Sequence, residues 1–357
     1  MENRNPFTIQ FGVTPFSYIS RISQSEEILD NLKNSYTGCM HLITGIRGSG
    51  KTVFMTHIVN SLEKEKDWIV ISLNPELDLY RSACSKLNKI LKGTNLKSKL
   101  SLSYKNITVG LENEQNHYEL LETELEELLK LSENKDKKIL FAIDEISNSD
   151  EVKKFLHSFQ IYIRENLPVY IIATGLPNNI SSLANYKTLT FLQRAERTHM
   201  DPLDLGRIRN EYKELLDVPD EIAVKMAKLT RGYSYAYQLL GNLVWKNNKV
   251  YDDSLLLKYD DMLAEYTYDK IYSEMSGKDL LFLKTIFDNN ITTVRELISV
   301  MGITAKEFSV YRDRLIKKGL IISRHRGQFE IVLPRFGEYL KNRELFENFE
   351  DSLGEII

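Results

Sequence analysis

The feature that most constrains the fold is a glycine-rich run between an apolar segment and a helix-forming segment. The run is Gly45-Ile46-Arg47-Gly48-Ser49-Gly50-Lys51-Thr52, and it fits the pattern GxxxxGK[ST]. The apolar residues Met40–Thr44 before it predict a strand, and Lys51–Glu65 predict a helix. A strand, a glycine-rich turn and a helix in this order are typical of a phosphate-binding loop, or P-loop.

Each residue type in this loop has a physical role. Glycines let backbone amides turn inward around phosphate oxygens, and the positive end of the helix dipole favours the same anions. Lys51 is expected to reach the β and γ phosphates, and the Thr52 hydroxyl to hold Mg²⁺. The sequence therefore predicts that Gly45–Val53 bind a nucleotide, with ATP and Mg²⁺ as the expected cofactors.

Two carboxylates follow a second apolar strand. Ile139–Ile143 predict the strand, and Asp144 and Glu145 come directly after it. We expect Asp144 to contact the Mg²⁺ shell and Glu145 to polarise the attacking water as general base. Two adjacent acids can also form an ordinary turn, but together with the P-loop they predict ATP hydrolysis to ADP and phosphate.

A third apolar segment, Val169–Ala173, ends in Thr174. Ligands of open α/β sheets bind at the carboxyl ends of the strands, so the Thr174 hydroxyl is a candidate for orienting the water or the γ phosphate. The alternative is that Thr174 only caps the following turn. Arg194 and Arg197 are candidates for a finger inserted into a neighbouring subunit's site, with surface pairing to Glu196 as the alternative.

The order of the elements predicts the fold class. The predicted strands, which also include Trp68–Leu73, alternate with helices and are continuous apolar runs. Such runs are typical of a parallel sheet covered on both faces. We expect an α/β P-loop nucleotide-binding core over residues 1–198, with a β-hairpin insertion near 100–112. An all-helical lid over 199–275, a winged helix over 276–345 and a C-terminal helix over 346–357 are expected to follow.

Composition excludes several classes of protein. Only Cys39 and Cys84 are present, without a CxxC pattern, so neither a disulfide framework nor a structural metal site is indicated. The apolar runs are much shorter than the roughly 20 residues that span a membrane, and no secretory signal is apparent, so we expect a cytoplasmic protein. A net charge of -3 argues that any nucleic-acid contact is local.

The C-terminal segment is the most basic part of the chain. Residues 277–341 contain 12 Lys and Arg against 7 Asp and Glu. Three helix starts have the Ser/Thr-x-x-acid form, at Ser276, Thr293 and Thr304, and two strands follow the third helix. This order predicts a winged helix, for which double-stranded DNA is the expected partner, although winged helices also bind proteins.

The predicted DNA contacts lie in two places. The third helix presents its outward side to a major groove, and the wing between the two strands is short and basic. The candidate residues are Lys306, Ser309, Arg312, Lys317, Lys318, Arg324, His325 and Arg326.

The P-loop, the Asp144-Glu145 strand, Thr174 and the helical lid together resemble an AAA+ ATPase over nearly the whole chain. The order of core, lid and winged helix is similar to the origin-recognition and replication-initiator clade and to related bacterial and archaeal ATPases. The resemblance implies that Tyr18, Ile19 and Arg21 lie near adenine, with Ser20 in place of the usual Gly.

The lid departs from the family pattern. The turn Thr230–Tyr235 resembles the second sensor of the family but has Tyr235 where an arginine is usual. The resemblance implies that Arg231 takes that role or that the coupling of the lid to the γ phosphate is weakened. In the second case, slow turnover or switch-like ATP binding is expected.

Two functions are consistent with these features. The first is an ATPase, in a possible homo-oligomer, whose nucleotide state controls DNA binding through the winged helix. The alternative is a STAND-like nucleotide switch that controls a protein partner, with the winged helix used for internal packing. Salt-dependent DNA binding separates the two.

Overall fold

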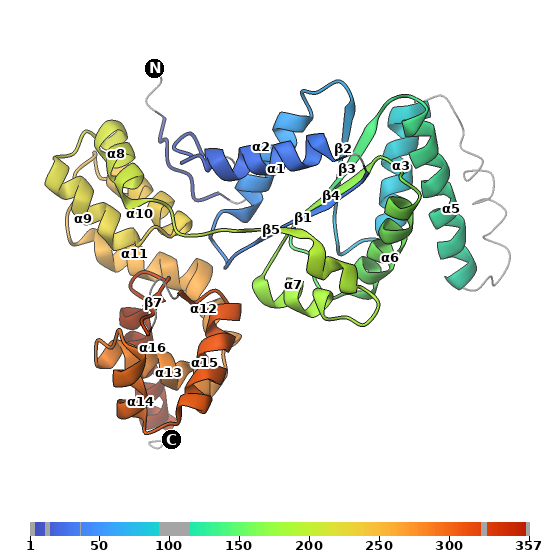
Figure 1. The fold of residues 1–357 in the computed structure, drawn as a ribbon. Helices are drawn as coiled ribbons and strands as arrows, with labels where there is room; N and C mark the ends of the chain where they lie inside the picture. The colour runs from blue at the N-terminus through green and yellow to red at the C-terminus, as the bar shows by residue number, and fades with distance from the viewer. Residues whose placement is uncertain (1–3, 11–14, 36, 93–113, 323–326, 355–357) are drawn as a thin grey trace. The chain divides into compact units, whose positions relative to one another are not determined.

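The structure is a computed structural model that describes residues 4–10, 15–35, 37–92, 114–322 and 327–354. The predicted hairpin near 100–112 and the predicted wing residues Arg324, His325 and Arg326 lie outside the described residues. Figure 1 shows the chain with its helices and strands labelled.

The chain divides into two compact units. The sheet unit contains Arg21–Gly45 and Lys51–His199, and the helical unit contains Met1–Ser20, Ile46–Gly50 and Met200–Ile357. The first residues of the chain and the apex of the P-loop therefore belong to the helical unit. The predicted domain boundaries divide the chain differently and stay predictions.

The sheet unit contains five parallel strands in the order β2-β3-β4-β1-β5. The predicted parallel α/β sheet is therefore confirmed, and only its edge strand β5 was not predicted from the sequence. The strands are β1 (Met40–Thr44), β2 (Trp68–Leu73), β3 (Lys138–Ile143), β4 (Val169–Gly175) and β5 (Glu196–His199).

Helices cover both faces of this sheet (Figure 1). Alternate strand residues such as Leu42, Phe141 and Ile171 share one core cluster with α3, α5, α6 and α7, while α1 and α2 lie on the other side. The period-two alternation of strand side chains explains this division. The helices are α1 (Ile22–Asn34), α2 (Lys51–Leu62), α3 (Leu79–Lys92), α5 (Glu114–Glu133), α6 (Asp150–Arg164) and α7 (Pro177–Ala184).

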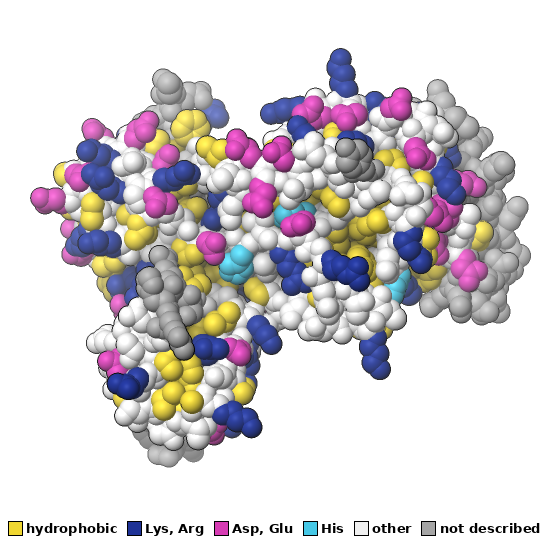
Figure 2. Space-filling model, in the orientation of Figure 1, with side chains coloured by type: hydrophobic (Ala, Val, Ile, Leu, Met, Phe, Trp, Pro, Cys, Tyr) yellow, Lys and Arg dark blue, Asp and Glu magenta, His cyan; other side chains and the backbone are white. Residues whose placement is uncertain are grey.

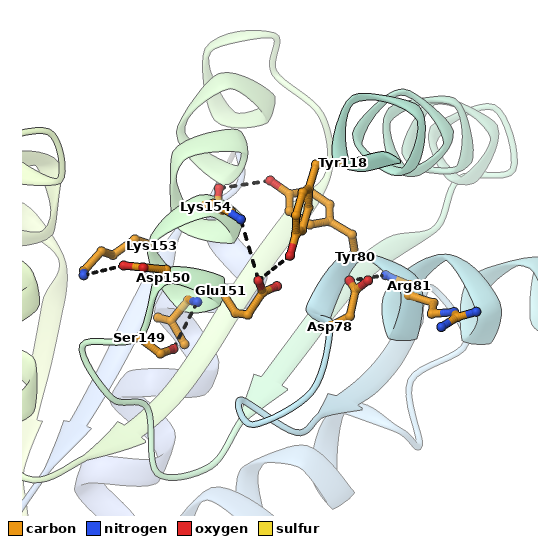
Figure 3. A network of polar contacts seen from close by, with 10 residues as sticks. Asp78, Tyr80, Arg81, Tyr118, Ser149, Asp150, Glu151, Lys153 and Lys154 are labelled. Atoms are coloured by element: carbon orange, nitrogen blue, oxygen red, sulfur yellow. Dashed lines mark hydrogen bonds and ion pairs between the residues drawn. The ribbon is translucent and has the colours of Figure 1, made fainter. Parts of the chain in front are cut away.

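A polar network joins α3, α5 and α6 (Figure 3). The Tyr118 hydroxyl donates to Glu151 Oε1 over 2.5 Å, and Lys154 Nζ lies 3.6 Å from the centroid of the Tyr118 ring. The Tyr80 hydroxyl donates to the backbone carbonyl of Lys154 over 3.0 Å. Because these partners lie far apart in sequence, the network fixes how α5 packs beside the sheet.

The predicted lid, in the helical unit, contains three helices: α8 (Leu205–Leu216), α9 (Asp220–Thr230) and α10 (Ser234–Lys246). Buried aromatic rings, including Tyr212 and Tyr237, form their core together with Phe7 from the start of the chain. The linking segment consists of α11 (Leu255–Leu263), a π-helical stretch η2 (Ala264–Tyr268) and α12 (Asp269–Ser273).

The C-terminal elements of the helical unit follow the predicted order of three helices and two antiparallel strands. Ser276 and Thr304 form complete capping boxes, and the Thr293 hydroxyl accepts from the amide of Glu296, so all three predicted helix starts are observed. The assignment as a winged helix stays a prediction. The elements are α13 (Gly277–Asp288), α14 (Val294–Met301), α15 (Ala305–Lys317), β6 (Ile321–Ile322), β7 (Glu330–Ile331) and α16 (Phe336–Gly354).

Helix α16 begins ten residues before the predicted C-terminal helix of 346–357. The chain is helical from Phe336 to Gly354, and the predicted domain boundary at 345/346 stays a prediction. Phe336, Tyr339 and Leu340 are buried, which anchors the start of this helix in the core of the helical unit. None of the helices in the described part of the chain has the length and apolarity needed to cross a bilayer.

A buried carboxylate ties α13 to α15. Asp279 accepts from the Arg314 guanidinium over 2.6 Å, and Lys318 Nζ lies 3.3 Å from its other oxygen. Burial raises the pKa of Asp279, but the hydrogen bonds from Ser276 and Arg314 and the charge of Lys318 outweigh it and hold the pKa below its usual value. Because a buried ion is costly without its partners, these cations are committed to the fold.

We expect His41 to make the sheet unit sensitive to mild acid. Its imidazole is buried on β1 and hydrogen-bonded to Thr198, and burial lowers its pKa from 6.5 to about 4. The unfolded chain therefore takes up a proton first, and stability falls as pH drops from 6.5 towards 4, by about 3 kcal/mol. Chemical unfolding of the wild type and of His41→Gln between pH 7 and pH 4 checks this.

The matched control is His199→Gln, because the His199 side chain is exposed at the end of β5. The wild type and the control should lose stability over this range more steeply than His41→Gln. Parallel pH profiles for all three proteins would contradict the expectation.

Candidate functional site

Three strand ends meet at the carboxyl edge of the sheet. The β1 strand leads into the P-loop, β3 leads into Asp144, and β4 carries Thr174 near its end. Since β4 lies between β1 and β3, Thr174 is paired with Ile43 of β1, and its neighbour Ala173 is paired with Ile143 of β3. This register brings Thr174 beside Asp144, as the topology of open α/β sheets leads one to expect.

The Asp144 carboxylate is shared by two hydroxyl groups. Thr52 Oγ1 donates to one carboxylate oxygen over 2.9 Å, and Thr174 Oγ1 donates to the other. The amide of Glu145 in turn donates to Thr174 Oγ1 over 2.9 Å. The structure therefore brings together four residues that separate sequence motifs predicted, and Thr174 does more than cap a turn.

Glu145 has an unusual backbone conformation. Its φ is 56°, in the left-handed region that a non-glycine residue rarely adopts. Such strain costs of order 1 kcal/mol or more and is concentrated at functional sites. Glu145 is exposed at this turn while Asp144 is partly buried, so the two adjacent acids can serve different purposes.

Lys51 begins helix α2 and is largely buried. Its ammonium donates to the carbonyl of Gly45 over 3.0 Å, across the span of the loop. Thr52 and Val53 follow in the first turn of α2 and are partly buried. The position of a lysine at the positive end of a helix, with backbone amides nearby, suits an anionic ligand.

The residues present fit ATP with Mg²⁺. Magnesium in proteins is usually held by one or two carboxylates together with substrate phosphates, and Asp144 and Thr52 supply a carboxylate and a hydroxyl at one point. The described residues contain no group of three or more His, Cys, Asp or Glu side chains suited to a metal held by protein alone. Thr44 Oγ1, at the end of β1, is buried without a hydrogen-bond partner among the described residues.

The apex of the P-loop, Ile46–Gly50, packs within the helical unit. Three consecutive lid residues donate to three consecutive loop carbonyls. The Tyr233 hydroxyl donates to Arg47 O over 2.6 Å, the Ser234 hydroxyl to Ser49 O over 3.0 Å, and the Tyr235 amide to Gly48 O over 3.0 Å. We call residues 233–235 the lid turn.

Close packing accompanies these hydrogen bonds. A Cβ atom on Gly48 would lie 2.1 Å from the Tyr233 hydroxyl, and Gly48 has a φ of 71°. Gly319, after helix α15, is packed so tightly on Ile46 that a Cβ atom would lie 2.4 Å from Ile46 Cγ2. The lid and the C-terminal elements therefore both contact the loop apex, in which Gly48 and Gly50 have φ values of 71° and 89°.

The other predicted nucleotide contacts have varied surroundings. Ile19 is buried in the core of the helical unit, Tyr18 is partly buried, and Arg21 precedes helix α1 in the sheet unit. The Arg231 guanidinium donates to the carbonyl of Ile331 over 3.2 Å. Tyr235 contacts the loop through its backbone, and burial raises the pKa of its hydroxyl to about 12.

The two candidate finger arginines lie near the edge strand. Arg194 ends a short 3₁₀ helix, η1 (Thr190–Arg194), and its side chain is exposed. Arg197 lies in β5, and its guanidinium donates to the carbonyl of Leu192 over 2.9 Å. Arg194 is therefore the better placed of the two to reach another molecule.

The described DNA-contact candidates differ in their availability. Lys306 and Lys317 of α15 are exposed, Ser309 and Arg312 are partly exposed, and Arg312 pairs with Asp313 over 2.8 Å. Lys318 is held by Asp279, so we leave it out of the candidate surface. On the visible face in Figure 2, Lys and Arg side chains are interspersed with Asp and Glu.

The contribution of Tyr233 and Ser234 was not predicted from the sequence. The turn that contains them stands out for its missing arginine, but a hydroxyl that donates to a carbonyl leaves no distinctive pattern in sequence. The available signal was the run of two tyrosines and a serine immediately after Gly232, a residue whose φ is 78°.

Comparisons with known proteins agree with this geometry. A family profile described as Nephrocystin 3, N-terminal, matches residues 19–175, and one described as a domain of unknown function (DUF8462) matches residues 267–340. No curated protein sequence matches the chain. The first profile covers the P-loop, Asp144 and Thr174.

Two solved structures are similar over most of the chain. The Walker-type ATPase PABY2304 of Pyrococcus abyssi has a TM-score of 0.65 and 16% identity, and the match covers 91% of this chain and 96% of that one. The ORC2 protein of Aeropyrum pernix, solved as ADPNP-ADP complexes, has a TM-score of 0.57 and 11% identity, with 93% and 96% covered. The chain therefore has the α/β fold of AAA+ P-loop ATPases, as the sequence predicted.

We expect Gly48→Ala to damage the loop apex. The new methyl group would displace the Tyr233 hydroxyl from Arg47 O, and alanine disfavours a φ of 71°. The variant should lose about 1–3 kcal/mol of stability and bind ATP at least roughly tenfold more weakly. Thermal unfolding and nucleotide titration measure the two effects.

Gly277→Ala is the matched control, because nothing lies within 4 Å of a Cβ atom at that position. It should change stability by no more than about 0.5 kcal/mol and leave ATP binding unchanged. Equal stability and equal ATP affinity in Gly48→Ala and Gly277→Ala would contradict the tight packing of Gly48 against Tyr233.

Proposed function

We propose that this protein binds ATP with Mg²⁺ and hydrolyses it. The observation that carries the proposal is the Asp144 carboxylate, which accepts hydrogen bonds from the hydroxyls of both Thr52 and Thr174. That arrangement joins the start of helix α2 to the ends of β3 and β4, where phosphoryl-transfer sites in open α/β sheets are found.

Each residue has a specific part in this chemistry. Lys51 and the loop amides would bind the β and γ phosphates, and Thr52 and Asp144 would hold Mg²⁺. The metal would neutralise charge that develops on the phosphate oxygens. Glu145 accepts the proton of the attacking water. Thr174 is buried and donates to Asp144, so it fixes the carboxylate and the turn that presents Glu145.

Glu145→Gln should separate binding from hydrolysis. The amide keeps the size of the side chain but cannot accept the proton, so the ATPase rate should fall by about 10²–10⁴-fold. ATP affinity should stay within about threefold of the wild type, because Glu145 is not part of the loop that holds the phosphates. Phosphate release and equilibrium nucleotide titration measure the two quantities.

Glu165→Gln, at an exposed residue that follows helix α6, is the matched control and should leave the rate unchanged. An unchanged rate in Glu145→Gln would remove Glu145 from the mechanism. Negligible turnover in all three proteins with tight ATP binding would favour a nucleotide switch.

We further propose that nucleotide state controls binding of double-stranded DNA by the C-terminal elements. Support comes from the physical link between the loop apex and those elements: Ile46 packs on Gly319, and Arg47 lies 3.4 Å from Glu274. Helix α15, which ends just before Gly319, presents Lys306 and Lys317 to solvent. A change at the loop would thus reach the base of the predicted recognition helix.

Lys306→Glu combined with Lys317→Glu removes two exposed cations that can contact DNA phosphates. The double variant should bind DNA more weakly, and its affinity should depend less on salt concentration. Each phosphate interaction that is lost should reduce the slope of log K against log salt by about 0.9, so loss of both should reduce it by about 1.8. Binding to duplex DNA, measured with ATP at several salt concentrations, tests this. Lys246→Glu combined with Lys258→Glu makes the same change of charge in the lid and linking helices and should leave the slope unchanged.

A nucleotide switch that controls a protein partner is the second candidate. The lid turn favours it, because Tyr233, Ser234 and Tyr235 hold three loop carbonyls and the usual lid arginine is absent. Absence of any salt-dependent DNA binding with ATP present would favour this candidate. In either case Arg194 is the proposed finger in a homo-oligomer, and Arg194→Ala should lower the ATPase rate only at concentrations at which the chain assembles.

A further inference from the structure

A basic cavity lies within the helical unit, away from the nucleotide loop. Its volume is about 470 Å³, and it is surrounded by the second half of α9, the end of α13 and the start of α16. None of its lining residues belongs to the P-loop. The charged residues that line it are Lys225, Lys228, Arg231, Arg335, Glu338 and Lys341.

The charge of the lining is strongly unbalanced, with five cationic side chains and one carboxylate. Part of this charge is neutralised nearby, since Lys225 pairs with Asp253 over 2.7 Å and Arg335 pairs with Asp260. Lys228 and Lys341 are exposed and have no ion pair within the described part of the chain. Like charges that converge on one cavity repel each other, and an anionic ligand removes that repulsion.

Two further features suit an anion. Gly337 and Glu338 lie in the first turn of the 19-residue helix α16, where backbone amides lack partners within the helix and the dipole favours negative charge. Leu229 and Phe287 supply partly buried apolar surface, which reduces the local dielectric and strengthens charge interactions. Cations, helix amides and apolar surface therefore converge on the same cavity.

Three residues that line the cavity have a left-handed backbone conformation near helix ends. Arg231, Asn290 and Arg335 have φ values of 48°, 50° and 53°, in the left-handed region. Each contributes to the lining, and each adjoins the end or the start of one of the three helices that surround the cavity. The turns at these three helix ends thus direct lining residues towards a common space.

We propose that this cavity binds a small phosphorylated molecule with two or more phosphate groups, which contact Lys228, Lys341 and Arg231. The volume is within the range of roughly 300–1,000 Å³ usual for small-molecule sites, and it is too small for a duplex. Because α9 belongs to the lid and α16 to the C-terminal elements, the bound ligand stabilises their contact. Arg231 is also a predicted nucleotide contact, but in the structure its guanidinium donates to the carbonyl of Ile331, and none of the residues proposed to hold ATP and Mg²⁺ lines the cavity. The proposed site does not require hydrolysis.

Calorimetric titration of the full chain with inorganic tripolyphosphate, in Lys51→Ala and without Mg²⁺, tests the proposal. The Lys51→Ala change weakens phosphate binding at the P-loop, so the expected result is one remaining site per chain. Adding Lys228→Glu and Lys341→Glu should weaken that site at least roughly tenfold, since charge-assisted hydrogen bonds are removed. Adding Lys246→Glu and Lys258→Glu instead should have less than about a twofold effect.

Thermal unfolding without ligand establishes that each variant folds. If the variant with both charge reversals does not fold, Lys228→Gln combined with Lys341→Gln takes its place. Absence of binding in Lys51→Ala, or an equal weakening in the control, would overturn the proposal. The proposal would also be overturned if the Lys228→Glu and Lys341→Glu changes left tripolyphosphate binding unchanged and abolished only the binding of duplex DNA. ATPase activity is not read out, so failure here is distinct from failure of the proposed hydrolysis.

Discussion

The proposed nucleotide site depends on one carboxylate that accepts hydrogen bonds from two hydroxyls. Asp144 follows β3, Thr174 lies on β4 and Thr52 lies in the first turn of α2, so their contact requires the two strands to be in one register. A slip by one residue would send Thr174 to the opposite face of the sheet. The buried apolar residues of β3 and β4 fix this register, and hydrophobic packing therefore determines where the proposed catalytic groups lie.

The loop apex uses its two kinds of backbone group for different partners. The carbonyls of Arg47, Gly48 and Ser49 accept from the lid turn, while positive-φ glycines allow amides to face a phosphate. Because the N–H and C=O groups of a peptide unit are held in one plane, a nucleotide that reorients the loop N–H groups would also reorient the carbonyls that accept from the lid turn. For the proposed nucleotide site, these contacts offer the lid a route to respond to the ligand through backbone geometry, in place of the charge of an arginine.

Strongly patterned segments could be predicted from the sequence, and weakly patterned ones could not. Met40–Thr44 and Trp68–Leu73 are continuous apolar runs and form strands at the predicted residues. Strand β5, Glu196–His199, contains three polar or charged residues beside one threonine, and only pairing with β1 makes it a strand. Likewise the site residues follow from motifs, whereas the contact of Tyr233 with Arg47 joins segments far apart in sequence and has no local signal.

The distribution of free cations determines where the helical unit can hold anions. On and after α15, Arg314 and Lys318 are committed to the buried Asp279, and Arg312 pairs with its neighbour Asp313. Because a buried ion pair cannot be opened without a large cost, the charges held by Asp279 are not available to DNA. The third helix of the C-terminal segment therefore offers DNA fewer cations than the basic composition of the segment indicates. Two of the basic residues of this segment, Arg335 and Lys341, instead line the cavity between α9, α13 and α16.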